Sequence, residues 1–251
     1  MNREEKNKFG NFVHEQRKKE EEVLEICQDI FANSRNELAV SMRYFQSALS
    51  ALKIVPSGET HTANVRLVTE EDRGNGITKP RPYTDVDGMI TNVPGLVLAT
   101  FYADCVPLYF IDPVHRAIGL SHSGWRGTVA KIGEVTVRRM QEEFGSDPSE
   151  IYGAVGPSIC QDCYEVSEDV IEQFRAAFPQ DKWDALFYGK PDGKYQLDLW
   201  EANHQIMLGA GLKEEHISMP NLCTCCNPEF LFSHRASHGR RGNLGAFLGI
   251  R

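Results

Sequence analysis

A thiol, an imidazole and a guanidinium lie close together in the middle of the chain, each beside an apolar run. Cys105 follows the run at 96–102, and His122 ends a second run, which begins at Ala117 and leads into the turn holding Arg126. Both runs have the composition of buried strands. Thiolate and imidazole bind soft and borderline metals, and an arginine at a strand end suits an anion. The segment therefore predicts a small-molecule site.

A third ligand would turn this segment into a metal site, and His61 is the candidate. It lies just before a predicted strand at 64–68. Taken singly, His61 is typical of a surface histidine and Cys105 of a core thiol. Together with His122 they fit a zinc site with three protein ligands and an open fourth position. These residues do not form a short local motif, so their spacing alone leaves the site a hypothesis.

Two further residues could handle an anion or a proton. Arg126 lies in a glycine-flanked turn that feeds a predicted helix, where N–H groups and the helix dipole favour negative charge. The turn is neither a Walker loop nor a dinucleotide fingerprint. His234 follows a second apolar run and could donate a proton, with Arg235 as another anion contact. The alternative for Arg126 is a structural salt bridge.

The cysteines indicate reduced thiols rather than a disulfide scaffold, because seven is an odd number and no secretory signal is visible. Cys160-x-x-Cys163 and Cys223-x-Cys225-Cys226 raise the question of a four-cysteine zinc site. Their spacings are irregular and match no zinc-ribbon pattern. The sequence alone therefore favours the interpretation that they are loop and core thiols.

Composition limits the class of partner. The net charge of −8 argues against a general binder of nucleic acids or membrane surfaces. The first residues are charged rather than apolar, and no apolar run approaches the length of a membrane span. We expect a cytoplasmic protein that acts on small molecules.

Hydrophobic periodicity changes along the chain. Helical spacing dominates residues 1–58, and a mixture of strands and helices without strict alternation follows, which predicts one α/β-type domain. The predicted strands lie at 64–68, 96–111, 117–120, 151–155, 195–199, 230–232 and 246–250. The predicted helices lie at 127–144, 167–178, where a serine cap opens the helix, and 201–208.

Several segments together resemble one family. They are Glu59-Thr60-His61, Thr84-Asp85-Val86-Asp87-Gly88, Tyr102-Ala103-Asp104-Cys105-Val106-Pro107-Leu108, Ser121-His122-Ser123-Gly124-Trp125-Arg126-Gly127, Gly156-Pro157-Ser158-Ile159, Cys223-Thr224 and Phe232-Ser233-His234-Arg235. They are similar to the YfiH/YlmD family of purine nucleoside phosphorylases, formerly described as laccase-like multicopper polyphenol oxidases. The resemblance runs from about Glu59 to the C-terminus.

The resemblance implies a single-domain layered α/β sandwich with mixed β-sheets over residues 1–251, with an atypical helical region at 1–58. It implies zinc held by His61, Cys105 and His122, with copper as the alternative metal. It also implies phosphorolysis of adenosine, inosine and methylthioadenosine, together with adenosine deamination. We expect Cys105, His122, Arg126 and His234 to be the catalytic residues, and purine nucleosides and phosphate to be the partners.

Three alternatives remain open. Cys105 could be the nucleophile of a metal-independent hydrolase with His122 as its base. The older description suggests a copper-dependent polyphenol oxidase, although one three-ligand site does not supply several coppers. The third alternative is a catalytically silent protein that retains the metal site.

Overall fold

The computed structural model describes residues 61–76, 80–219 and 222–250. The predicted helical region 1–58 lies outside the described residues. Residues 61–73 and 81–250 belong to one packed unit, which holds every element described below.

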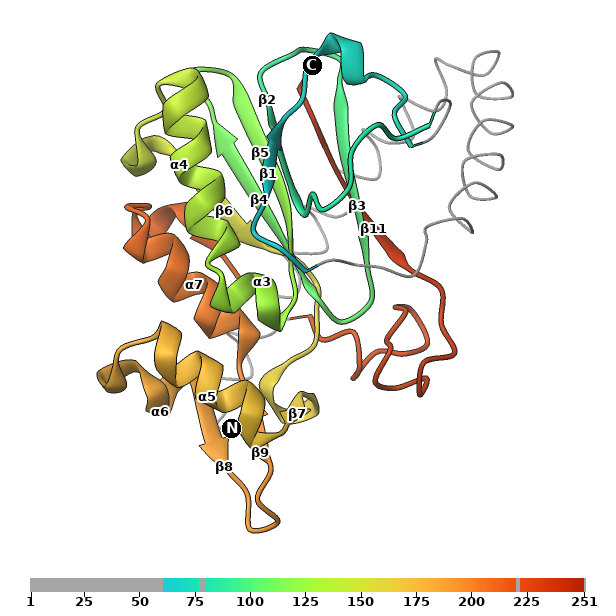
Figure 1. Cartoon of the computed structure of the whole chain (residues 1–251), viewed down its shortest axis with the longest axis vertical. Coiled ribbons are helices and arrows are strands. Elements are labelled where there is room, and N and C mark those ends of the chain that lie inside the picture. Colours follow the sequence, from blue (N-terminus) through green and yellow to red (C-terminus); the bar gives the residue numbers. More distant parts are fainter. Residues whose placement is uncertain (1–60, 77–79, 220–221, 251) are drawn as a thin grey trace, which may run out of the picture. The chain divides into compact units, whose positions relative to one another are not determined.

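A six-stranded mixed sheet forms the centre of this unit (Figure 1). The outer pairs β1–β2 and β6–β10 are parallel, and the three pairs between them are antiparallel. In spatial order the strands are β1 (Val65–Leu67), β2 (Gly88–Thr91), β5 (Ala117–Ser123), β4 (Val106–Asp112), β6 (Tyr152–Val155) and β10 (Ile217–Ser218). The predicted α/β class with mixed sheets is confirmed.

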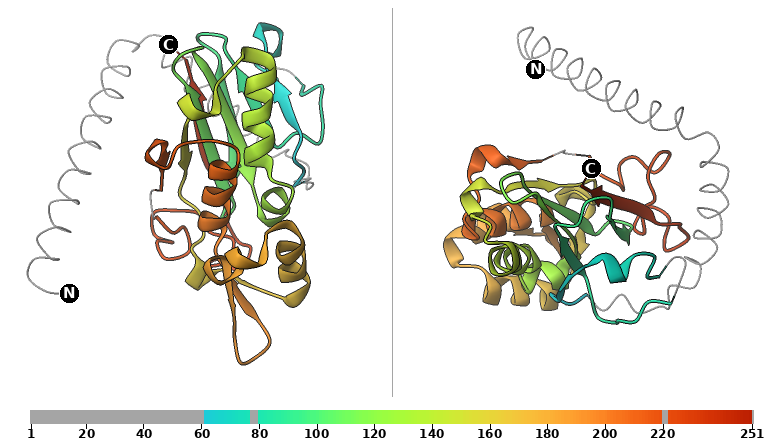
Figure 2. Two further views of the ribbon diagram at one scale, coloured as in Figure 1. Left: turned by 90° about the vertical axis from the view of Figure 1, so that its left-hand side faces the viewer. Right: turned by 90° about the horizontal axis from the view of Figure 1, so that it is seen from above.

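Both faces of the central sheet are covered, which explains why β4 and β5 read as continuous apolar runs. On one face lie α4 (Ile132–Phe144) and α7 (Leu199–Gly209). On the other lies the antiparallel ribbon of β3 (Val97–Tyr102) and β11 (Leu244–Gly249). Figure 2 shows these layers from above, with α4 seen end-on.

The alternation of side chains along β5 assigns its residues to the two faces. Ile118 and Leu120 pack in the cluster formed with β3 and β11. Gly119 faces α4, and a Cβ there would lie 2.9 Å from the Thr136 methyl group. Because alternate residues of a strand share a face, His122 is expected on the same side as Leu120.

A smaller three-stranded sheet follows along the chain and packs with its own helices (Figure 1). Its apolar residues join those of α4, β4 and α7 in one continuous core. The strands are β7 (Glu165–Val166), β9 (Tyr195–Leu197) and β8 (Phe187–Gly189), and the helices are α5 (Glu168–Ala177) and α6 (Trp183–Leu186). Short 3₁₀ turns lie at η1 (Glu70–Asp72), η2 (Pro148–Glu150), η3 (Gln161–Cys163), η4 (Gln180–Lys182) and η5 (Glu214–His216). No described helix has the length and apolar character needed to span a membrane.

The helix predicted at 127–144 is two helices, which corrects the prediction. The chain forms α3 (Trp125–Val129), breaks, and resumes as α4. Lys131 has φ of 55°, in the left-handed region, so a continuous helix cannot pass through it. This break allows α3 to take its own direction beside the end of β5.

The strand predicted at 230–232 is also wrong, because these residues form a turn. Phe230 and Phe232 are 81% and 51% exposed, so their apolar character does not reflect burial. Ser167 does occupy the position before α5, but its hydroxyl contacts the Asp169 carboxylate rather than capping the backbone.

Candidate metal centre

The three predicted metal ligands come together from separate parts of the chain. The donor atoms of His61, Cys105 and His122 all lie within 4.8 Å of one another. His61 precedes β1, Cys105 lies between β3 and β4, and His122 is in β5. The two imidazole ring centroids are 5.5 Å apart. We call these three residues the His-Cys-His cluster.

Strand register explains this convergence. Val65 of β1 pairs with the first residue of β2, which in turn pairs with Ser121 of β5. The segment that precedes β1 is therefore delivered beside His122. Cys105 comes directly before β4, whose first residue pairs with Ser123. The cluster thus lies at one end of the β4–β5 hairpin.

Asp87 joins the two histidine segments. His122 Nδ1 lies 3.3 Å from one Asp87 carboxylate oxygen, and Thr62 donates to the other oxygen through its amide and its hydroxyl, each at 2.7 Å. Burial raises the pKa of Asp87, but these hydrogen bonds lower it more, so the pKa lies below its ordinary value. A proton held on Nδ1 by a carboxylate directs the Nε2 lone pair toward a metal.

Gly124 permits the close approach of two ligands. A Cβ at this position would lie 2.8 Å from His61 Cδ2 and 3.0 Å from Cys105 Sγ. The first contact is shorter than real Cβ atoms make and the second is tighter than most, so a larger residue would displace the His61 ring and press on Cys105. Gly124 therefore forms part of the surface against which His61 and Cys105 pack.

The two neighbouring histidines lower the pKa of the Cys105 thiol. Burial raises its pKa, whereas hydrogen bonds and charge from His122 and His61 lower it, leaving a pKa of about 7. A thiol with this pKa is substantially ionised at neutral pH. Thiolate is the form that binds a metal and also the form that acts as a nucleophile.

The backbone is strained on both approaches to the cluster. His61 has φ of 42° and Asp104 has φ of 80°, a region that residues with a Cβ rarely adopt. The buried Asp104 carboxylate accepts hydrogen bonds from the Thr224 hydroxyl and the Arg235 amide, both at 2.7 Å. These contacts hold the turn that presents Cys105.

A buried polar network fixes α3 at the end of β5. The Ser123 hydroxyl lies 2.9 Å from the Thr128 hydroxyl and donates to the Asn203 carbonyl oxygen at 2.9 Å. Thr128 also donates to the Gly124 carbonyl at 3.0 Å. Because α7 supplies Asn203, this helix anchors the turn that carries Arg126.

Arg126 is exposed and lies over the Trp125 ring, 4.2 Å from its centroid. It makes no ion pair with the part of the chain that the structure describes. Burial raises the pKa of Tyr164 most; the charge of Cys105 also raises it, and that of Arg126 lowers it. Arg126 lies two residues after Gly124, which packs against His61 and Cys105, so the turn that carries Arg126 adjoins the cluster.

The structure gives His234 and Arg235 different roles. The His234 side chain is exposed, and Arg241 Nε lies 3.5 Å from its Nδ1. The Arg235 guanidinium donates to the carbonyls of Cys163 and Glu165, so it supports the backbone rather than offering a second anion contact.

Sequence reasoning did not select Asp87, Asp104 or Gly124 as site residues. The signals that mark them are a carboxylate directly before β2, a carboxylate inside an otherwise apolar run, and a glycine between His122 and Arg126. Each signal is ambiguous until strand register places the residue beside the cluster.

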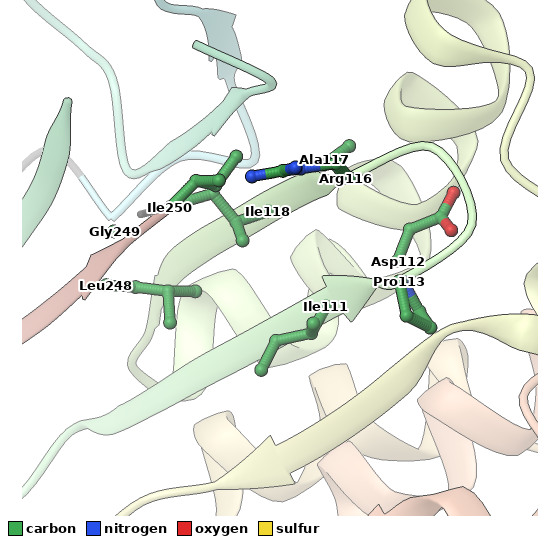
Figure 3. Close-up of a pocket in the computed structure, with 9 residues that line it drawn as sticks. All are labelled: Ile111, Asp112, Pro113, Arg116, Ala117, Ile118, Leu248, Gly249 and Ile250. Carbon is green, nitrogen blue, oxygen red and sulfur yellow. The ribbon is translucent and has the colours of Figure 1, made fainter. Parts of the chain in front are cut away.

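A shallow apolar hollow lies at the other end of the β4–β5 hairpin (Figure 3). Ile111, Ile118 and Leu248 line it, together with the turn that joins the two strands. Neither a histidine nor a cysteine lines it, whereas the His-Cys-His cluster lies at the opposite end of the hairpin.

Comparison with known proteins assigns the chain to a family. The family model described as "Multi-copper polyphenol oxidoreductase laccase" matches residues 30–251. The chain belongs to this family. Relatives and solved structures that carry the names YlmD and YfiH confirm the resemblance seen in the sequence.

Relatives within the laccase-like family have names that refer to purine nucleosides. The chain is 40% identical over 194 residues to "Purine nucleoside phosphorylase YlmD" of Bacillus subtilis, covering 77% of this chain and 69% of that protein. It is 33% identical to "Adenosine deaminase RL5" of an unknown prokaryotic organism, covering 72% and 69%. The crystal structure of YlmD from Geobacillus stearothermophilus superposes with a TM-score of 0.73 at 39% identity, covering 77% and 72%.

We predict that Asp87→Asn lowers zinc affinity at the His-Cys-His cluster by about 10- to 100-fold, because the His122 ring loses the carboxylate that orients it. Competition with a chromophoric chelator measures this change. Asp85→Asn is the matched control, since it removes the same charge from an exposed position in the same segment. Equal zinc affinity in the two variants would contradict the role assigned to Asp87.

Proposed function

We propose that the protein catalyses zinc-dependent phosphorolysis of purine nucleosides, with adenosine, inosine and methylthioadenosine as substrates, and that it also deaminates adenosine. The observation that carries this proposal is the gathering of three metal-ligand side chains within 4.8 Å beside the turn that bears Arg126. The names of the relatives supply the substrate class. Purine nucleosides and phosphate are the proposed partners, and the cytoplasm is the proposed location.

The residues of the cluster fit zinc. One thiolate and two imidazoles are ligands that zinc favours, and three protein ligands leave the fourth position of a catalytic site for a reactant. The Asp87–His122 pair supplies the carboxylate that metal-binding histidines ordinarily contact. When bound, zinc would act as a Lewis acid or activate water.

Zinc is preferred to copper on the basis of the available ligands. Among the described residues, the other group of potential metal ligands consists of four cysteines and contains no histidine. Reduction of dioxygen by a multicopper oxidase needs several coppers, and a second imidazole-rich site is therefore required. The described part of the chain favours a single catalytic metal.

Phosphorolysis assigns distinct tasks to the remaining side chains. Arg126 binds phosphate through its guanidinium and directs an oxygen toward C1′ of the nucleoside. As the C1′–O bond forms, the glycosidic C1′–N bond breaks and its electrons go to the purine. His234 is the candidate general acid: as the imidazolium it would give a proton to the departing base, leaving neutral imidazole, or it would contact phosphate.

Incubation of the purified protein with inosine and phosphate tests the proposal. Hypoxanthine and ribose 1-phosphate should appear together, and omission of phosphate should abolish both. Adenosine alone should yield inosine and ammonia. A protein that contains zinc in the cluster but turns over no purine nucleoside would contradict the proposed function and support the catalytically silent alternative.

A second candidate, a metal-independent cysteine hydrolase, is favoured by one observation. Cys105, His122 and Asp87 lie in the order of nucleophile, base and orienting carboxylate. Alkylation distinguishes the two candidates. A zinc-bound thiolate is shielded, so iodoacetamide should modify Cys105 slowly until a chelator is added; rapid alkylation and activity in the presence of chelator would support the hydrolase.

A further inference from the structure

Four cysteines outside the His-Cys-His cluster converge at one place. The sulfur atoms of Cys160, Cys163, Cys223 and Cys226 all lie within 4.8 Å of one another. Cys226 Sγ is 3.9 Å from Cys160 Sγ and 3.4 Å from Cys163 Sγ. We call these residues the four-cysteine cluster. Each pair has C-x-x-C spacing, and in the sequence alone a four-cysteine zinc site is the less favoured interpretation of these residues.

Backbone pairing brings the two cysteine-bearing segments together. Ser158 and Cys223 form an isolated parallel bridge. The Ser158 amide donates to the Leu222 carbonyl at 3.2 Å, and the Thr224 amide donates to the Ser158 carbonyl at 3.1 Å. This bridge holds the segment that carries Cys160 and Cys163 beside the segment that carries Cys223 and Cys226. The fold therefore brings the four cysteines together.

Two backbone amides point at one sulfur of the cluster. The amides of Cys160 and Cys226 lie 3.3 and 3.4 Å from Cys223 Sγ and donate hydrogen bonds to it. Such bonds offset negative charge on sulfur and therefore suit a thiolate. A neutral, inert core thiol has no need of two donors.

The sulfur separations match a single tetrahedral ion. Four thiolates at a zinc–sulfur distance of about 2.3 Å lie roughly 3.8 Å from one another. The observed separations bracket this value and exceed the length of a disulfide bond, about 2.05 Å. An iron–sulfur cluster places inorganic sulfide and several irons between the thiolates and needs a wider cage.

We propose that Cys160, Cys163, Cys223 and Cys226 bind one Zn²⁺ in a closed structural site. All four tetrahedral positions are taken by protein sulfur, so the site has no position for substrate. The proposal is independent of the proposed function, because it concerns a different set of ligands.

Hydrogen bonds join the four-cysteine cluster to the turn that presents Cys105. Thr224, next to Cys223, donates its hydroxyl to the Asp104 carboxylate at 2.7 Å. Arg235 donates its amide to the same carboxylate and its guanidinium to the Cys163 carbonyl. A zinc ion that joins the two cysteine segments would therefore stabilise the turn immediately before a ligand of the His-Cys-His cluster.

Zinc content of purified variants tests the proposal. The double variant Cys105→Ser/His122→Ala, which lacks two ligands of the other cluster, should retain one zinc per chain. X-ray absorption at the zinc edge should show four sulfur neighbours at about 2.3 Å. The double variant Cys163→Ser/Cys226→Ser should hold one zinc fewer than the unmodified protein. Cys225→Ser is the matched control and should lose none, because Cys225 lies outside the four-cysteine cluster.

Cys105→Ser/His122→Ala retains all four cysteines, so it tests the proposal even if Cys163→Ser/Cys226→Ser does not fold. Absence of zinc from Cys105→Ser/His122→Ala would overturn the proposal, as would iron in its place or nitrogen ligands in the absorption spectrum. Intact-mass measurement of protein purified without oxygen should give the mass of the fully reduced chain after zinc removal; a lower mass, with the disulfide mapped by peptide analysis to two of the four ligand cysteines, would also overturn it. If this variant keeps zinc and the unmodified protein holds no additional zinc, the structural site stands and the zinc-dependent function fails.

Discussion

Replacement of Cys105 by alanine is expected to remove zinc from the His-Cys-His cluster and to lower kcat/KM for inosine phosphorolysis about 1,000-fold or more. The thiolate supplies the one anionic ligand of this cluster, and two imidazoles alone hold zinc poorly. Metal catalysis contributes several kcal/mol to transition-state stabilisation, and each 1.4 kcal/mol corresponds to a factor of ten in rate. Zinc content and steady-state kinetics of the same preparation measure both effects.

Cys225→Ala is the matched control for this experiment, because it removes a partly buried thiol that belongs to neither cluster. It should keep its zinc and its activity. Retention of full activity by Cys105→Ala would refute the metal mechanism.

His61→Ala separates the metal mechanism from cysteine hydrolysis. In the zinc mechanism His61 is a ligand, so its loss should be nearly as damaging as loss of Cys105. In a hydrolase the Cys105–His122–Asp87 set supplies nucleophile, base and orienting carboxylate, and His61 only helps to lower the pKa of Cys105, so its loss should be far less damaging. An active, zinc-free His61→Ala protein would therefore favour the hydrolase.

The parts of the site that sequence could predict are those with a local signal. His122 and Cys105 are polar residues at the ends of apolar strands, and such positions are where small-molecule sites form in α/β proteins. The strands themselves were recognisable because both faces of the central sheet are buried, which gives continuous apolar runs.

The parts that sequence could not predict depend on register or on tertiary contacts. Asp87 reaches His122 because β2 pairs with β5, and nothing local distinguishes it from the exposed Asp85. The four-cysteine cluster depends on the bridge between Ser158 and Cys223, which joins segments far apart in the chain. The apolar residues of 127–144 keep helical spacing throughout, so the sequence does not reveal the break at Lys131. That break depends on a tertiary contact, the hydrogen bond between Ser123 and Asn203 that holds α3 at the end of β5.

If Arg126 binds phosphate, its loss should impair phosphorolysis much more than deamination. Arg126→Ala is expected to lower kcat/KM for phosphorolysis about 100- to 1,000-fold, the effect of removing one preorganised donor from developing or bound negative charge. Deamination of adenosine consumes water rather than phosphate. Its rate should therefore change by only a few-fold, at unchanged zinc content.

Arg138→Ala provides the matched control, since Arg138 is an exposed arginine on the neighbouring helix α4 with a loose ion pair to Glu142, at 3.8 Å. It should leave both activities intact. If Arg126→Ala instead lowers both activities equally, the arginine acts on the nucleoside or on the structure of the turn, and phosphate must be bound by another group. If it raises the KM for phosphate without altering that for inosine, the guanidinium is the phosphate contact, because only the anion would then sense its removal.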